Sequence, residues 1–167
     1  MENLMSYQTA LASSRVLEIL KAFDATLTGT FPLSISISSS DLDVACFAPD
    51  SAVFLEVVTR NFEEHQNFRI KSRNDIGARI VSFDFMGFPF EIFSQPIPVH
   101  QQMSYRHMVA ERIILDHHGD AFRCGIIILK ESGLKTEPAF AKALHITGDA
   151  YHGVLDYAER LRHKQRN

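Results

Sequence analysis

Two aspartates, Asp41 and Asp43, stand one residue apart in the segment DLDVACF of residues 41–47. The segment alternates polar and apolar residues and then becomes wholly apolar, which is typical of a partly buried strand. Side chains two residues apart on a strand point to the same face, so these two carboxylates would repel each other. A divalent cation such as Mg²⁺ or Mn²⁺, which prefers oxygen ligands, would make this arrangement favourable.

A third carboxylate would complete a site that holds two cations for phosphoryl or nucleotidyl transfer. Two acids are candidates: Glu91, which is the single charge in the apolar run 88–93 and which we favour, and Asp84. The sequence leaves the choice between them open. An Asp-x-Asp pattern is also common at turns and caps with both acids in solvent, and this is the alternative explanation.

Gly29 and Thr30, about a dozen residues before the aspartates, could bind a phosphate. A glycine lets the backbone approach the phosphate closely, and the neighbouring hydroxyl and amides can donate hydrogen bonds to it. A turn or a helix C-cap would use the same pair. Lys135 precedes a predicted helix, whose N-terminus attracts anions, so it could add a phosphate contact; helix capping by Thr136 and Glu137 is the alternative.

Three basic residues, Arg69, Lys71 and Arg73, alternate along a predicted strand. They could offset the charge of a triphosphate, because a nucleotidyl-transfer site must hold several negative charges. A strand face or edge in solvent is the simpler explanation of the same pattern.

A second group of candidates, Tyr105, Arg106 and His107, lies on a predicted helix and could contact a substrate. Glu111 follows His107 by four residues, so the two share one face of that helix. Such a pair is commonly a surface contact.

The elements that must position these residues follow from periodicity and turn signals. Met86-Gly87 is predicted as the turn of a hairpin over 78–95, which pairs Phe85 with Phe88 and Ser82 with Glu91. Strands are also expected over 41–47 and 68–73. Helices are expected over 7–24, 51–65, about 100–117, 119–132, 137–145 and 149–163.

Length and composition predict a single domain over residues 1–167, with an α/β core over about 1–98 and a helical part over about 99–163. The net charge of −3 argues against a general electrostatic nucleic-acid binder. The sequence shows no signal peptide and no apolar run long enough for a membrane span. These two features predict a cytoplasmic protein. Cys46 and Cys124 have apolar neighbours and are expected to be buried free thiols, with a single disulfide as the alternative.

These residues together resemble the nucleotidyltransferase superfamily built on the DNA polymerase β palm. Its signature begins with an apolar residue, then a Gly, and then either Ser or Gly. After a gap comes Asp-apolar-Asp/Glu-apolar, and a third acid follows on a later strand. Here Gly29-Thr30, a gap over 31–40, Asp41-Leu42-Asp43-Val44 and Glu91 follow that order, with Thr30 as the departure. The segments EIFSQPIPV, YRHM and GLKTEPAFAKAL also resemble a small bacterial family of unknown function placed in that superfamily.

The resemblance covers about residues 27–157 and implies a mixed α/β sheet flanked by helices, an α+β fold with a helical C-terminal part. It implies that Asp41, Asp43 and Glu91 are catalytic and bind Mg²⁺ or Mn²⁺. We also expect nucleotide contacts at Gly29, Thr30, Ser40 and Lys135. The resemblance supports substrate contacts at Tyr105, Arg106 and His107, but it brings no known substrate.

The expected function is metal-dependent transfer of a nucleoside monophosphate from a nucleoside triphosphate to a hydroxyl acceptor. A small-molecule acceptor is favoured over long nucleic acid, because the chain is not basic overall. The alternatives are a nucleotide-binding sensor without catalysis and a subunit that depends on a partner protein. The sequence names neither the nucleotide nor the acceptor, and it leaves the oligomeric state open.

Overall fold

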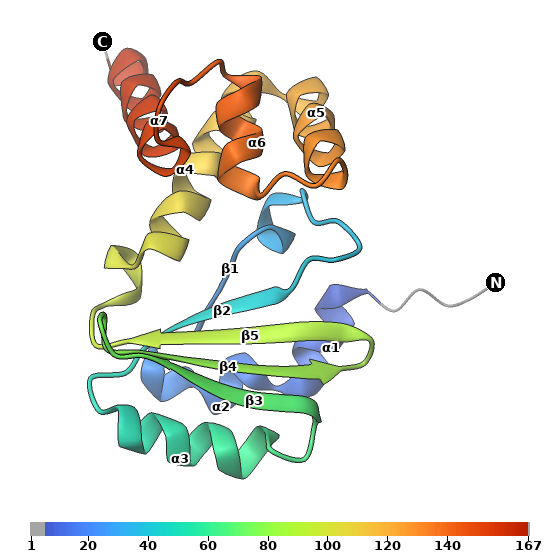
Figure 1. Ribbon diagram of the computed structural model, residues 1–167, viewed down its shortest axis with the longest axis vertical. Coiled ribbons are helices and arrows are strands. Elements are labelled where there is room, and N and C mark those ends of the chain that lie inside the picture. Colours follow the sequence, from blue (N-terminus) through green and yellow to red (C-terminus); the bar gives the residue numbers. More distant parts are fainter. Residues whose placement is uncertain (1–5, 167) are drawn as a thin grey trace, which may run out of the picture. The chain divides into compact units, whose positions relative to one another are not determined.

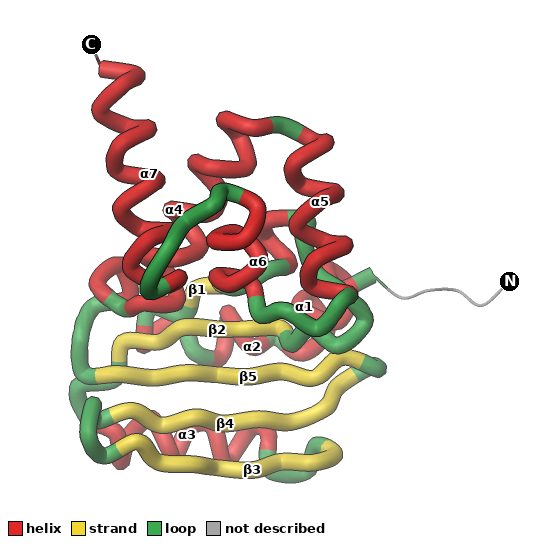
Figure 2. Tube along the Cα trace, turned by 45° about the horizontal axis from the view of Figure 1, so that its top comes forward, coloured by secondary structure: helices red, strands yellow, loops and turns green. Residues whose placement is uncertain are grey.

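The chain forms two compact units in the computed structural model, which describes residues 6–166 (Figures 1 and 2). The first unit combines the chain up to Gly29 with Asp41–Gln102. The second combines Thr30–Ser40 with the chain from Met103 onward. A single domain over the whole chain stays a prediction.

The first unit is built on a five-stranded sheet in the order β1-β2-β5-β4-β3 (Figure 1). Its strands are β1 (Thr26–Thr28), β2 (Leu42–Phe47), β3 (Gln66–Arg73), β4 (Ala78–Phe85) and β5 (Phe88–Gln95). Strands β2 and β5 are parallel, whereas the other neighbouring pairs are antiparallel. The predicted mixed sheet is therefore confirmed.

The predicted hairpin is present as β4 and β5, with Phe85 opposite Phe88 and Ser82 opposite Glu91. Met86 and Gly87 both have positive φ, as a two-residue hairpin turn requires. The alternation of the strands then gives the sheet two different faces. One face carries buried apolar side chains, namely Leu42, Val44, Val81, Phe83, Phe90 and Ile92. The other face carries Asp43, Ser82, Asp84 and Glu91.

Helices cover the apolar face of this sheet: α1 (Tyr7–Ser14), α2 (Val16–Ile19), a 3₁₀ turn (Lys21–Phe23) and α3 (Ser51–Phe62) (Figures 1 and 2). Asp50 caps α3 by accepting hydrogen bonds from the backbone N–H groups of Ala52 and Val53. Phe62 of α3 stacks on Phe83 of β4 with ring centroids 5.0 Å apart. This packing leaves the polar face of the sheet to the candidate site.

The expected helix over 7–24 is wrong as one element. Arg15 adopts φ 54°, which ends α1, and Asp24 with φ 54° ends the following 3₁₀ turn. Ser14 donates its hydroxyl to the Leu11 carbonyl, a local bond that competes with regular helix. The sequence also missed β1, because three residues are too few to show a period.

The described part of the second unit contains a 3₁₀ turn (Phe31–Leu33) and four α-helices: α4 (Met103–His118), α5 (Asp120–Glu131), α6 (Thr136–Ala143) and α7 (Ala150–Arg166). The helix expected from residue 100 begins later, because Val99–Gln101 form a 3₁₀ turn and Gln102 is extended. A shared apolar core joins the helices to the segment 30–40. Its buried members are Leu33, Ile35, Ala110, Ile114, Leu115, Ile126, Ala139, Phe140, Val154, Ala158 and Leu161.

Three cationic side chains of the helices hold the backbone of the segment 30–40. Arg112 donates to the Pro32 carbonyl at 2.7 Å, and Lys130 donates to the buried Ile35 carbonyl at 2.6 Å. Arg123 donates to the Leu33 carbonyl. Because this segment begins after Gly29 and ends before Asp41, helical residues determine the conformation of the connection between two candidate site positions.

We expect Lys130→Met to lower the free energy of unfolding by about 1–3 kcal/mol, because the buried Ile35 carbonyl loses its donor. Urea unfolding followed by circular dichroism measures the change. Lys142→Met, at an exposed lysine of α6, is the matched control and should leave the midpoint unchanged. Equal midpoints for the two variants would contradict this role of Lys130.

The two cysteines are free, as expected, but only Cys46 is buried. Burial, and secondly the charge of Asp24, raises the pKa of the Cys46 thiol to about 12. Cys124 of α5 is exposed, so the prediction that it is buried is wrong. Within residues 6–166, no helix is both long and apolar enough to cross a membrane.

Candidate active site

The parallel pairing of β2 with β5 brings two of the predicted acids together. Asp43 and Glu91 are direct partners in this register, and both are half-buried on the polar face of the sheet. Asp41 immediately precedes β2 and is exposed. Two carboxylates that are 48 positions apart in the sequence therefore lie side by side on neighbouring strands.

A pocket of ≈ 320 Å³ in the sheet unit is lined by three acids, Asp41, Asp84 and Glu91. Asn67 and Arg69 of β3 also line it. Asn67 has φ 58° at an irregularity of the β3–β4 register and donates its side-chain amide to Asp84. Sequence reasoning missed Asn67, and the only local signal was that asparagine tolerates this left-handed conformation.

The electrostatics of the pocket show that its acids repel one another. Partial loss of solvent around its carboxyl group, and secondly the charge of Asp84, raises the pKa of Asp41. Burial, and secondly the charge of Asp41, raises the pKa of Glu91, which Lys71 lowers in part. A cation among these groups would relieve the repulsion, so the donor set fits a cation that prefers oxygen ligands.

The two candidates for the third carboxylate have different neighbours. Glu91 is the register partner of Asp43, whereas Asp84 is paired with Pro89 across the hairpin and bonded to Asn67. The register therefore favours Glu91 as the residue that acts together with Asp43. Asp84 contributes negative charge near Asp41.

Gly29 follows β1 and approaches Asp43 so closely that the Asp43 side chain would have to move to admit any other residue there. A Cβ atom added at this position would lie 2.1 Å from Oδ2 of Asp43. The φ of Gly29 is 73°, a conformation that residues with a side chain rarely adopt. The structure thus places the backbone of Gly29 against one of the predicted catalytic acids.

Thr30 and Ser40 are the ends of the segment 30–40. The Thr30 carbonyl accepts hydrogen bonds from the backbone N–H groups of Leu33 and Ile35, both at 3.2 Å. The Ser40 hydroxyl accepts one from the N–H of Ile37 at 2.9 Å. Both ends of the segment therefore have defined local conformations next to Gly29 and Asp41 in the chain.

The three basic residues of β3 differ in their surroundings. Arg69 lines the pocket of the acids, and the charge of Lys71 acts on Glu91. Arg73 instead pairs with Asp75 at 2.8 Å, at the exposed end of the strand. The structure brings Arg69 and Lys71 to the acids but not Arg73.

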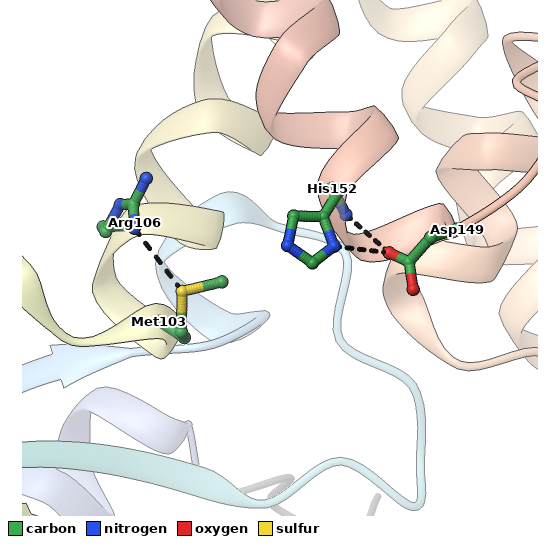
Figure 3. Close-up of polar contacts among 4 residues, drawn as sticks. All are labelled: Met103, Arg106, Asp149 and His152. Carbon is green, nitrogen blue, oxygen red and sulfur yellow. Dashed lines mark hydrogen bonds and ion pairs between the residues drawn. The ribbon is translucent and has the colours of Figure 1, made fainter.

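The helical unit holds the remaining predicted residues. Tyr105 is half-buried and Arg106 is exposed on α4, where Arg106 donates to the Met103 sulfur at 3.6 Å (Figure 3). Figure 3 also shows His152 of α7 against Asp149, with the ring nitrogen 3.0 Å from the carboxylate. Lys135 is exposed at the N-cap of α6 and makes no side-chain cap bond.

His107 is buried, with 5% of its surface exposed, and Glu111 one turn later is 3% exposed. The interpretation of this pair as a surface contact is therefore wrong. Glu137 in the first turn of α6 lies close to both, a neighbour that the sequence did not indicate.

A comparison with protein-family models gives a match over residues 9–157 to DUF4269, a domain of unknown function. The chain belongs to the DUF4269 family. A comparison with curated proteins gives no match.

Several solved structures resemble this DUF4269 chain, including the three that follow. The Cid1 poly(U) polymerase with MgGTP bound has a TM-score of 0.60 at 12% identity, covering 83% of this chain and 47% of its own. The GLD-2/RNP-8 complex has a TM-score of 0.54 at 11% identity. The match covers 80% of this chain and 52% of the chain in that complex. The polymerase core of TRAMP, an RNA surveillance complex, has a TM-score of 0.50 at 11% identity. The match covers 89% of this chain and 46% of the TRAMP chain.

These similarities show that the chain shares its fold with these solved structures, and they confirm the predicted mixed α/β fold class. At such identities they show the fold alone. The chain spans about half the length of these structures.

Proposed function

We propose that this chain is a metal-dependent nucleotidyltransferase, which moves a nucleoside monophosphate from a nucleoside triphosphate to a hydroxyl acceptor. The observation that carries the proposal is the pairing of Asp43 with Glu91 on parallel strands, with Asp41 beside them and Gly29 against Asp43. A fold shared with polymerases supports it.

In this proposal Asp41, Asp43 and Glu91 hold Mg²⁺ or Mn²⁺, because their donor atoms are all oxygens and a cation would offset the effect of the Asp41 charge on Glu91. The bound ions would neutralise the phosphates and favour in-line displacement of pyrophosphate. Glu91 helps to activate the acceptor hydroxyl.

Other residues have binding roles in the proposal. Gly29 and Thr30 offer backbone and hydroxyl donors to the phosphates, and Ser40 and Lys135 add contacts to the nucleotide. Arg69 and Lys71 supply positive charge beside the acids. Tyr105 and Arg106 contact the substrate; His107 was predicted to do the same, but its burial favours a role inside the helical unit.

We further propose a small-molecule acceptor, since the net charge of −3 offers no general attraction for long nucleic acid. A cytoplasmic location and a bacterial source stay predictions from the sequence.

The test is a titration of the protein with each of the four nucleoside triphosphates, with and without Mg²⁺, followed by an assay for pyrophosphate release with small alcohols and with short RNA. Metal-dependent binding and release with an alcohol is the expected result. Release with RNA alone would keep the reaction and overturn the acceptor class. Binding without release from any acceptor would favour the sensor. No binding to a folded protein would contradict the proposal.

A further inference from the structure

The helical unit contains a compact set of metal-ligating side chains that the proposed nucleotide chemistry does not use. His107 and Glu111 lie one turn apart on α4, and Glu137 lies in the first turn of α6. One ligand atom from each of the three lies within 4.8 Å of the other two. Two helices thus bring an imidazole and two carboxylates close enough to contact one ion.

The imidazole of His107 has an unusual environment. The residue is 5% exposed, and neither ring nitrogen has a hydrogen-bond partner among the described residues. Buried polar groups almost always have a partner, and leaving one unpaired costs about 1–3 kcal/mol. The contact of its ring with Tyr151, at 5.8 Å between centroids, is edge-to-face and satisfies neither nitrogen. His107 therefore has an unused ligand atom directed into the set.

Burial and neighbouring charges determine the pKa of Glu111. Burial raises the pKa of Glu111 well above its ordinary range, and the charge of Glu137 raises it further. The ammonium of Lys130 offsets part of this effect, while it also donates to the Ile35 carbonyl. A divalent ion held by these ligands would compensate the charges of the two carboxylates when both are ionised.

We propose that His107, Glu111 and Glu137 form a binding site for a divalent transition-metal ion, with Zn²⁺ as the best match. An imidazole nitrogen suits Zn²⁺ better than Mg²⁺, which prefers oxygen ligands alone. Ligand atoms on one tetrahedral Zn²⁺ lie about 3.3–3.5 Å apart. Small side-chain rotations would close the observed separation and would fasten α6 to α4.

The test is thermal melting of chelator-treated protein during addition of Zn²⁺, combined with metal analysis after dialysis. We expect one bound Zn²⁺ per chain and a rise in Tm of about 5–10 °C at a metal concentration 100-fold above Kd. His107→Gln and Glu111→Gln should abolish the rise. Glu137→Gln, at a half-buried position, provides the same readout if the change at Glu111 prevents folding.

Matched substitutions at exposed positions give the controls. His117→Gln at the end of α4 and Glu131→Gln at the end of α5 should keep the full rise in Tm. Asp41→Asn should keep it too, which separates this site from the nucleotide site. An unchanged Tm of the wild-type protein in Zn²⁺, or a full rise in the three ligand variants, would overturn the proposal.

Discussion

Replacing Asp41 with asparagine should reduce pyrophosphate release by about 10³-fold or more while leaving the protein at least as stable as the wild type. The loss is expected because Asp41 is proposed as a ligand of the ions that stabilise the transferred phosphoryl group, an effect of several kcal/mol. The measurement is pyrophosphate release at saturating nucleotide, with thermal melting of the same samples.

The expectation for stability follows from the raised pKa of Asp41 in the folded protein. Between the unfolded pKa of the carboxyl and its raised folded value, the folded state binds more protons than the unfolded state, so stability falls as pH rises. At neutral pH the charged carboxylate therefore costs stability, and asparagine removes that cost. The Tm of Asp41→Asn at pH 7 should be equal to or above that of the wild type.

Asp75→Asn is the matched control, because Asp75 is an exposed aspartate that pairs with Arg73 at the end of β3. This variant should keep full activity. An active Asp41→Asn protein would contradict the catalytic role, and a variant with a markedly lower Tm would contradict the electrostatic argument.

The second large effect is expected from Gly29→Ala. The added methyl group would lie 2.1 Å from the carboxylate oxygen of Asp43, so Asp43 or the β1 end of the chain must move. Gly87→Ala is a close control, since Gly87 has φ 80° and no atom within 4 Å of its added Cβ. Both substitutions strain the left-handed backbone, but only Gly29→Ala also creates a clash.

We expect Gly29→Ala to lose roughly 1–3 kcal/mol more unfolding free energy than Gly87→Ala. It should also lose metal-dependent nucleotide binding, because the displaced carboxylate is Asp43. Urea unfolding and nucleotide titration of the two variants measure these differences. Equal stability of the two proteins would show that the approach of Gly29 to Asp43 is not constrained.

Much of the sheet was predictable because its signals are local. Alternation over 78–95 and the Met86-Gly87 turn determined the register of the hairpin, which places Glu91 opposite Ser82 as expected. The spacing of Asp41 and Asp43 is a local signal as well, and their joint role stays a prediction.

The pairing of Asp43 with Glu91 could not be predicted from a local pattern, because it depends on β2 lying parallel to β5. The same holds for Asn67, which reaches Asp84 through an irregularity in the register of β3. A sequence period does not indicate which strands become neighbours.

By itself, the sequence determined the hairpin and most helices, because each depends on residues a few positions apart. Only the tertiary structure decided that the segment 30–40 packs with the helical unit through Lys130. Only it decided that His107 and Glu111 are buried beside Glu137. These contacts join residues far apart in the chain, and their energies come from burial and charge compensation, which no local pattern records.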